Sequence, residues 1–202
     1  VQGLRAIAAG MVLLYHACFF ANSVGGYAIA ISNAGAAGVD LFFILSGFII
    51  TYVTRNGSGP VDFLARRLIR IAPLYWFYTL ITTAILLLMP QAFANLKLDL
   101  GYFLSSWFFL LSTNNTGSVG TVLGVGWTIC YEFYFYLLFG LFLCLPKRFF
   151  HLGMWSLLAL GAAAQWVFTP PAFASVAISA LPLEFLAGCL LAKAFIRQWR
   201  LP

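Results

Sequence analysis

Long apolar runs are the feature that most limits what this chain can fold into. They cover residues 5–22, 36–54, 72–89, 125–145, 152–169 and 175–192. Each run is close to the roughly 20 residues that an α-helix needs to cross the hydrocarbon core of a bilayer. Only 8% of the 202 residues are charged, whereas soluble domains carry about 25%. The sequence therefore predicts an all-α fold, a polytopic transmembrane helix bundle of about six spans, as one domain over residues 1–202.

The composition also excludes several classes of protein. A chain that is 63% hydrophobic is not a disordered segment. The formal net charge is +6, but the basic residues separate apolar runs and form no polar face, so we expect no nucleic-acid partner. The cysteines lie within apolar runs without C-x-x-C spacing, which predicts neither a disulfide framework nor a zinc site. They are Cys18, Cys130, Cys144 and Cys189.

The positions of lysine and arginine predict an orientation, because these residues collect in cytoplasmic loops. With a cytoplasmic N-terminus, ten of the 11 basic residues fall on the inner side and Lys97 falls outside. The apolar stretch 102–111 is short for a crossing, and counting it as a span would destroy this asymmetry. We therefore expect residues 102–111 to be a re-entrant or interfacial segment.

Four ionisable residues fall inside the predicted spans, where a charge costs several kcal/mol and is a functional candidate by default. They are predicted at comparable depth in the outer half of the membrane and are His16, Asp40, Glu132 and Glu184. A carboxylate beside an imidazole orients it and raises its proton affinity, so one interpretation is a base that deprotonates a hydroxyl. The other is a histidine bonded to a backbone carbonyl, with acids that satisfy polar neighbours. No H-x-x-x-H or E-x-x-H pair indicates a metal site.

A basic cluster marks the inner end of the third run. Arg66, Arg67 and Arg70 precede Pro73, and the spacing of Arg67 and Arg70 places them on one helix face. Two guanidinium groups placed in this way can bind phosphate bidentately. Basic residues that flank a span are also ordinary anchors to lipid headgroups, and both interpretations remain open.

Four motifs follow one another along residues 3–140. They are Gly3-Leu4-Arg5 with His16 after a ten-residue gap, the run Gly38–Phe48, Arg67-Leu68-Ile69-Arg70 before Pro73, and Gly126-Trp127-Thr128-Ile129-Cys130-Tyr131-Glu132. Together they resemble the acyltransferase-3 family, integral-membrane O-acyltransferases that modify bacterial surface and secreted carbohydrates. Many members carry two neighbouring acids where this chain has Glu132 alone. This version is most similar to the exopolysaccharide acetyltransferase branch, of the succinoglycan type.

The resemblance implies a membrane-bound O-acyltransferase of the bacterial inner (plasma) membrane. It would move an acetyl or other short acyl group from cytoplasmic acyl-CoA, with acetyl-CoA as donor substrate and no bound cofactor. The acceptor would be a sugar hydroxyl of a surface polysaccharide or exopolysaccharide, on a lipid-linked unit or on the polymer. Family members have more spans than the six predicted here, which implies that C-terminal helices lie outside this sequence.

The resemblance also suggests roles for particular residues. His16 would be the general base or a transient acyl carrier, with Glu132 or Asp40 fixing its tautomer. Donor phosphates would be held by Arg67 and Arg70, together with Arg5, and the cavity would be shaped by Tyr75 and Trp127. The alternative is a proton-coupled carrier or flippase for a lipid-linked saccharide, in which the buried acids relay protons. A structural subunit of a polysaccharide export complex is a third possibility.

Overall fold

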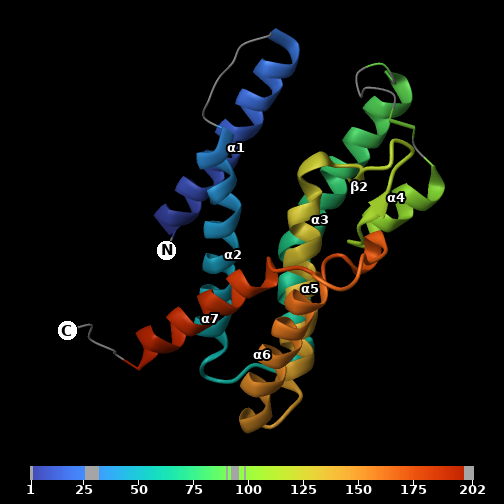
Figure 1. Ribbon diagram of the computed structural model, residues 1–202. Helices are drawn as coiled ribbons and strands as arrows, with labels where there is room; N and C mark the ends of the chain where they lie inside the picture. Colours follow the sequence, from blue (N-terminus) through green and yellow to red (C-terminus); the bar gives the residue numbers. More distant parts are fainter. Residues whose placement is uncertain (1, 26–31, 90, 92–95, 98, 198–202) are drawn as a thin grey trace. The chain divides into compact units, whose positions relative to one another are not determined.

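The computed structural model describes residues 2–25, 32–89, 91, 96–97 and 99–197 (Figure 1). These residues form two compact units, one of residues 1–56 with 183–202 and one of residues 57–182. The first unit contains α1 (Gln2–Gly25), α2 (Ser32–Thr54) and nearly all of α7 (Pro182–Ile196). The second contains α3 (Pro60–Leu88), α4 (Leu100–Trp107), β1 (Ser112–Thr113), β2 (Val119–Gly120), η2 (Gly124–Gly126), α5 (Trp127–Leu143), α6 (Lys147–Ala164) and η3 (Ala172–Ala174).

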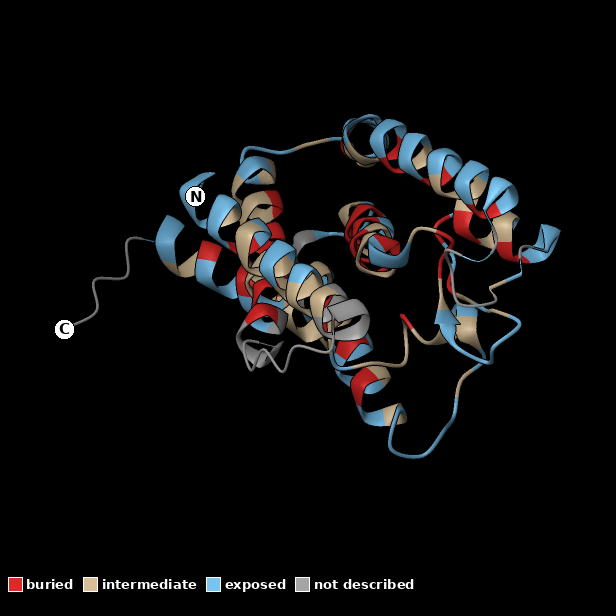
Figure 2. Ribbon diagram, turned by 90° about the horizontal axis from the view of Figure 1, so that it is seen from above, coloured by how far each residue is buried: buried red, intermediate tan, exposed pale blue. Residues whose placement is uncertain are grey.

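Three described segments are long and apolar enough to cross a membrane, namely Ala37–Thr54, Pro60–Leu88 and Gly124–Leu143. They agree with the predicted all-α membrane class. Many of their large apolar side chains are exposed. Figure 2 shows exposed residues along one side of a helix and buried residues along the other. The count of six spans and the single domain over residues 1–202 stay predictions.

Two helices differ in extent from the apolar runs that predicted them. The third apolar run was placed from residue 72, but α3 begins twelve positions earlier at Pro60, because proline is favoured in the first turn of a helix. The basic cluster therefore lies inside the helix. The last run was placed from residue 175, but η3 and turns occupy that region and α7 begins at Pro182, leaving 15 helical residues.

In the first unit, α1 and α2 form a closely packed antiparallel pair (Figure 1). A Cβ atom added at Gly35 would lie 2.4 Å from Cβ of Tyr15. One added at Gly38 would lie 2.8 Å from the carbonyl oxygen of Ala8. Small residues allow this approach of helix backbones in a membrane, where apolar side chains gain little by leaving lipid.

The opposite face of α2 packs against α7 through a second pair of glycines. A Cβ atom added at Gly47 would lie 2.0 Å from the carbonyl oxygen of Phe185, and one at Gly188 would lie 1.9 Å from that of Ile44. The rings of Phe43 and Phe185 stack beside this crossing, with centroids 4.7 Å apart. Helix α2 is thus held on both faces by backbone contacts that only glycine permits.

In the second unit, α5 packs against α3 and α6. Gly140 accommodates the side chain of Leu64, whose Cγ would lie 2.9 Å from an added Cβ. Phe139 joins the three helices, because its ring centroid lies 5.2 Å from Phe63 of α3 and 5.1 Å from Phe150 of α6. These aromatic contacts form the core of the unit.

Helix α4 and the β1–β2 hairpin form a cap on α3. With eight residues, α4 is about 12 Å long and too short to cross the hydrocarbon. The buried Ser106 hydroxyl donates to the carbonyl of Tyr102 and accepts from the backbone N–H of Val122. The indole of Trp76 donates to the carbonyl of Trp107 and stacks on its ring, with centroids 5.1 Å apart.

The glycine crossing of α2 and α7 leads to a stability prediction. We expect Gly188→Ala to lower the melting temperature of the detergent-solubilised protein, because the new methyl group overlaps the carbonyl of Ile44. Overpacking of this kind costs about 1–3 kcal/mol. The matched control is Gly10→Ala in α1, where an added Cβ meets nothing within 4 Å. Equal melting temperatures for Gly188→Ala and the control would contradict the crossing.

Candidate functional site

The predicted site residues are divided between the two units. Arg5, His16 and Asp40 lie in the first, on α1 and α2. The others lie in the second, on α3 and α5, and are Arg67, Arg70, Tyr75, Trp127 and Glu132. Each group therefore has its own geometry.

His16 is half-buried on α1, and its ring meets that of Tyr15 edge-on at 5.3 Å. The α1–α2 register does not bring Asp40 to it. Because Gly38 lies against Ala8 and Met11, Asp40 lies level with about residue 8 of α1, which is about 12 Å along the axis from His16. The expectation that these two groups share one depth is therefore not met within this unit.

Asp40 points to the other side of α2. It is seven residues before Gly47, close to two helical turns, so the two share the face that packs on α7. There Asp40 interacts electrostatically with the carboxyl group of Glu184. Oε2 of Glu184 is buried from water. Sequence reasoning placed both acids in the membrane, but it did not predict that they face each other.

Arg5 is half-buried and packs on α2, with its guanidinium carbon 5.6 Å from the ring centroid of Phe42. This is a cation–π distance, so the arginine contributes to the pairing of α1 and α2. Its predicted contact with donor phosphate stays a prediction.

Glu132 is the buried acid of the second unit, with 4% of its surface exposed. The phenol of Tyr136, one turn later on α5, donates a short hydrogen bond to Oε1 of Glu132. The guanidinium carbon of Arg67 lies 5.8 Å from the ring centroid of Tyr136 and 5.6 Å from that of Phe63. We call Phe63, Arg67, Glu132 and Tyr136 the arginine cluster.

The arginine cluster contains two residues that the sequence analysis missed. A signal for Tyr136 was present, since Glu132 and Tyr136 are four residues apart and such pairs share a helix face. No comparable signal pointed to Phe63, because its contact with Tyr136 joins two helices, with ring centroids 6.1 Å apart.

The three arginines at the start of α3 have different surroundings. Arg67 is half-buried in the arginine cluster, whereas Arg66 and Arg70 are exposed. Arg66 forms an ion pair with Asp62, one turn earlier on the same helix. Arg70 is the more accessible of the two predicted phosphate ligands.

Tyr75 and Trp127 were predicted to shape a cavity. Tyr75 is packed into the core of the second unit with 2% of its surface exposed, and its hydroxyl donates to the carbonyl of Ser106 at 2.8 Å. A Cβ atom at Gly126 would lie 2.8 Å from the Tyr75 ring, so glycine allows the start of α5 to reach α3. Trp127 is half-buried and meets the Tyr131 ring edge-on at 5.9 Å.

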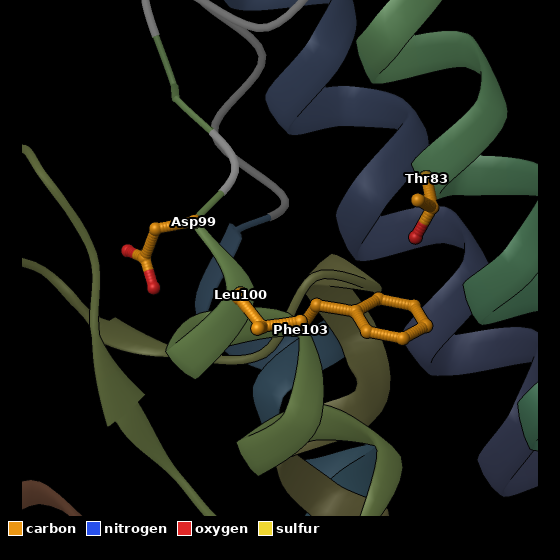
Figure 3. Close-up of a pocket in the computed structure, with 4 residues that line it drawn as sticks. All are labelled: Thr83, Asp99, Leu100 and Phe103. Atoms are coloured by element: carbon orange, nitrogen blue, oxygen red, sulfur yellow. The ribbon is translucent and has the colours of Figure 1, made fainter.

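A hollow of about 290 Å³ lies between the last part of α3 and the start of α4 (Figure 3). It is lined by Thr83, Asp99, Leu100 and Phe103, none of which is a predicted site residue. The Asp99 carboxylate points away from the Phe103 ring and caps α4 by accepting from the backbone N–H of Tyr102. Burial raises the pKa of the Tyr102 phenol, which therefore stays protonated.

Comparison with known proteins shows the family to which the chain belongs. The model of an acyltransferase domain, Acyl_transf_3, matches residues 1–200. The chain therefore belongs to the acyltransferase-3 family, as its motifs predicted. No solved structure matches it.

Three curated relatives are similar to this chain in sequence. The chain is 36% identical to the exopolysaccharide production protein ExoZ of Rhizobium meliloti (strain 1021), over 81% of this chain and 52% of the relative. It is 30% identical to the acyltransferase MdmB of Streptomyces mycarofaciens, over 84% of this chain and 45% of that relative. It is 26% identical to the peptidoglycan O-acetyltransferase OatA of Listeria monocytogenes, over 95% of this chain and 33% of that relative. The chain thus spans about half or less of the length of these relatives.

The hydrogen bond of Tyr75 can be tested by removing one oxygen. We expect Tyr75→Phe to lower the free energy of unfolding by about 1–3 kcal/mol, because a buried hydrogen bond to the Ser106 carbonyl is lost. Tyr78→Phe on the same helix is the matched control, since Tyr78 is 48% exposed. Thermal denaturation in detergent measures both. A loss of activity in Tyr75→Phe without any loss of stability would instead support a direct role in the cavity.

Proposed function

We propose that this chain forms part of an O-acyltransferase that moves an acetyl or other short acyl group from acyl-CoA to a sugar hydroxyl. The observation that carries the proposal is the arginine cluster in a chain of this family. It places a buried acid and a half-buried arginine in an apolar helix pair, where charges are expensive and are functional candidates by default.

The proposed chemistry balances without an external proton source. The sugar oxygen attacks the thioester carbonyl, the C–S bond breaks and an ester C–O bond forms. His16 accepts the hydroxyl proton and passes it to the departing thiolate of coenzyme A. In the covalent variant, a ring nitrogen of His16 first takes the acyl group and then yields it to the sugar oxygen.

The acid that orients His16 was expected to be Glu132 or Asp40. The α1–α2 register separates Asp40 from His16 along the helix, and Asp40 faces α7. The phenol of Tyr136 donates to Oε1 of Glu132. We therefore propose His16 as the reacting group, with Glu132 rather than Asp40 as the candidate for its orienting acid.

Donor binding is proposed for Arg67 and Arg70, with Arg5. Coenzyme A is polyanionic and cytoplasmic, and guanidinium groups bind phosphate through paired N–H donors. With the N-terminus in the cytoplasm, the start of α3 faces this compartment. The proposal thus includes an inner (plasma) membrane location and entry of the donor from the cytoplasmic side.

The acceptor is proposed to be a carbohydrate. One relative is named as an exopolysaccharide production protein and another as a peptidoglycan O-acetyltransferase. Both names indicate sugar polymers outside the cytoplasm. The hydroxyl could belong to a lipid-linked unit or to the finished polymer.

The second candidate is a proton-coupled carrier or flippase for a lipid-linked saccharide. The interaction of Asp40 with Glu184 favours it, because facing carboxyl groups on neighbouring membrane helices can relay a proton. Labelled acetyl-CoA supplied to membranes that contain the intact protein separates the two. Label in carbohydrate supports the transferase, whereas saccharide transport without consumption of acetyl-CoA supports the carrier.

The first prediction for this function concerns His16. We expect His16→Ala in the intact protein to abolish acyl transfer while membrane insertion is retained, because no other group replaces the base. His151→Ala is the control, since it alters the other histidine of the sequence. Transfer of labelled acetyl groups to carbohydrate is measured for both. Full activity of His16→Ala would remove His16 from the mechanism.

A further prediction concerns the arginines. We expect Arg67→Ala and Arg70→Ala to raise the KM for acetyl-CoA about tenfold or more, because charge-assisted hydrogen bonds to phosphate are lost. Arg66→Ala is the matched control, since Arg66 is already paired with Asp62. Initial rates at varied acetyl-CoA give KM and kcat. A KM as low as that of the control would argue against phosphate binding.

A further inference from the structure

We propose that Tyr136 is a positioning residue that fixes the direction in which Arg67 presents its guanidinium to the donor. It does so by holding Glu132 with its hydroxyl and by forming, with Phe63, an aromatic wall beside the arginine. This inference rests on the proposed function, since it assigns the donor contact to Arg67.

The first step is the bond between Tyr136 and Glu132. Both side chains are buried, with 3% and 4% of their surfaces exposed, and the phenol donates to Oε1 of the carboxylate. A buried carboxylate is stable only when its oxygens accept hydrogen bonds and a positive charge lies nearby. The phenol therefore fixes one oxygen of Glu132 in place.

The second step is the location of the positive charge. The guanidinium of Arg67 lies 5.6 Å from the Phe63 ring and 5.8 Å from the Tyr136 ring. These two rings meet edge-on at an angle of 84°. The charges of Glu132, Arg67 and Arg70 all act on the phenol of Tyr136. Tyr136 is thus the residue of α5 at which the acid and the arginines of α3 meet.

The third step is the effect on a ligand. A guanidinium is planar and carries five N–H donors in a fixed fork. Once rings restrict its plane, its remaining edge points in one direction and can meet phosphate bidentately with little loss of freedom. Removal of the phenol oxygen leaves the aromatic wall but releases Glu132, so the guanidinium gains other orientations. Donor binding therefore weakens.

The test is Tyr136→Phe in the intact protein. We expect the KM for acetyl-CoA and the dissociation constant of coenzyme A to rise about tenfold. A fall in kcat with unchanged coenzyme A binding would instead assign Glu132 to His16 and overturn the positioning role. Tyr134→Phe is the matched control on the same helix. Tyr134 is half-buried, and its hydroxyl makes no hydrogen bond to any residue that the structure describes. We expect this control to match the wild type in both measurements.

A double variant separates positioning from a merely structural role. If Tyr136 acts through Arg67, Tyr136→Phe will weaken coenzyme A binding no further once Arg67→Lys has removed the fork. An equal effect of Tyr136→Phe in both backgrounds overturns the proposal, as does an unchanged dissociation constant in the single variant. Should Tyr136→Phe fail to fold, Phe63→Leu tests the aromatic wall instead, because it removes one ring and leaves the hydroxyl in place. Unchanged coenzyme A binding in Phe63→Leu would then overturn the proposal.

The outcomes also distinguish this inference from the proposed function. A wild-type protein that binds coenzyme A and transfers acetyl groups, with a Tyr136→Phe variant identical to it, overturns the positioning role alone. A wild-type protein that neither binds coenzyme A nor transfers label overturns both.

Discussion

The close approach of helix backbones at glycines determines the geometry of the first unit. Helix α2 carries Gly35 and Gly38 toward α1 and Gly47 toward α7, on nearly opposite faces. In lipid, apolar side chains gain little from leaving their surroundings, so such contacts rather than a hydrophobic core set the register. The register then decides which polar groups can meet. It directs Asp40 toward Glu184 and leaves His16 at a different level of α1.

The second unit is organised around charge as well as packing. Helix α5 is apolar all round, and aromatic contacts with α3 and α6 would hold it without any ionisable residue. A buried carboxylate beside a guanidinium rarely stabilises a fold more than apolar residues of the same size would. The stability of the unit therefore does not explain why Glu132 is buried next to Tyr136, whose ring also faces Arg67.

Sequence reasoning found the apolar helices and the family, because hydrophobicity and motif order are properties of the chain itself. The roles of the site residues stay predictions. Helix α3 extends beyond its apolar run because the charged residues after Pro60 continue the helix, and the start of α7 was placed too early because apolar turns before Pro182 read as a helix. Sequence reasoning also could not predict that Asp40 and Glu184 face each other. A helix that is apolar on every side carries no periodicity to indicate which face meets which neighbour, so the contact of Asp40 with Glu184 required coordinates.

Helix α3 carries residues of the arginine cluster, the α4 cap and the hollow along its length, with Pro73 inside the helix. Arg67 lies near its start, Tyr75 and Trp76 are fixed to the α4 cap further along, and Thr83 borders the hollow at its far end. From residue 67 to residue 83 the helix rises about 24 Å, most of the thickness of the hydrocarbon core. The backbone of Arg67 is fixed by this helix, so the remaining freedom of the residue is rotation of its side chain. The rings of Phe63 and Tyr136 lie beside that side chain, so under the proposed function backbone and aromatic contacts together would set where the guanidinium meets a phosphate.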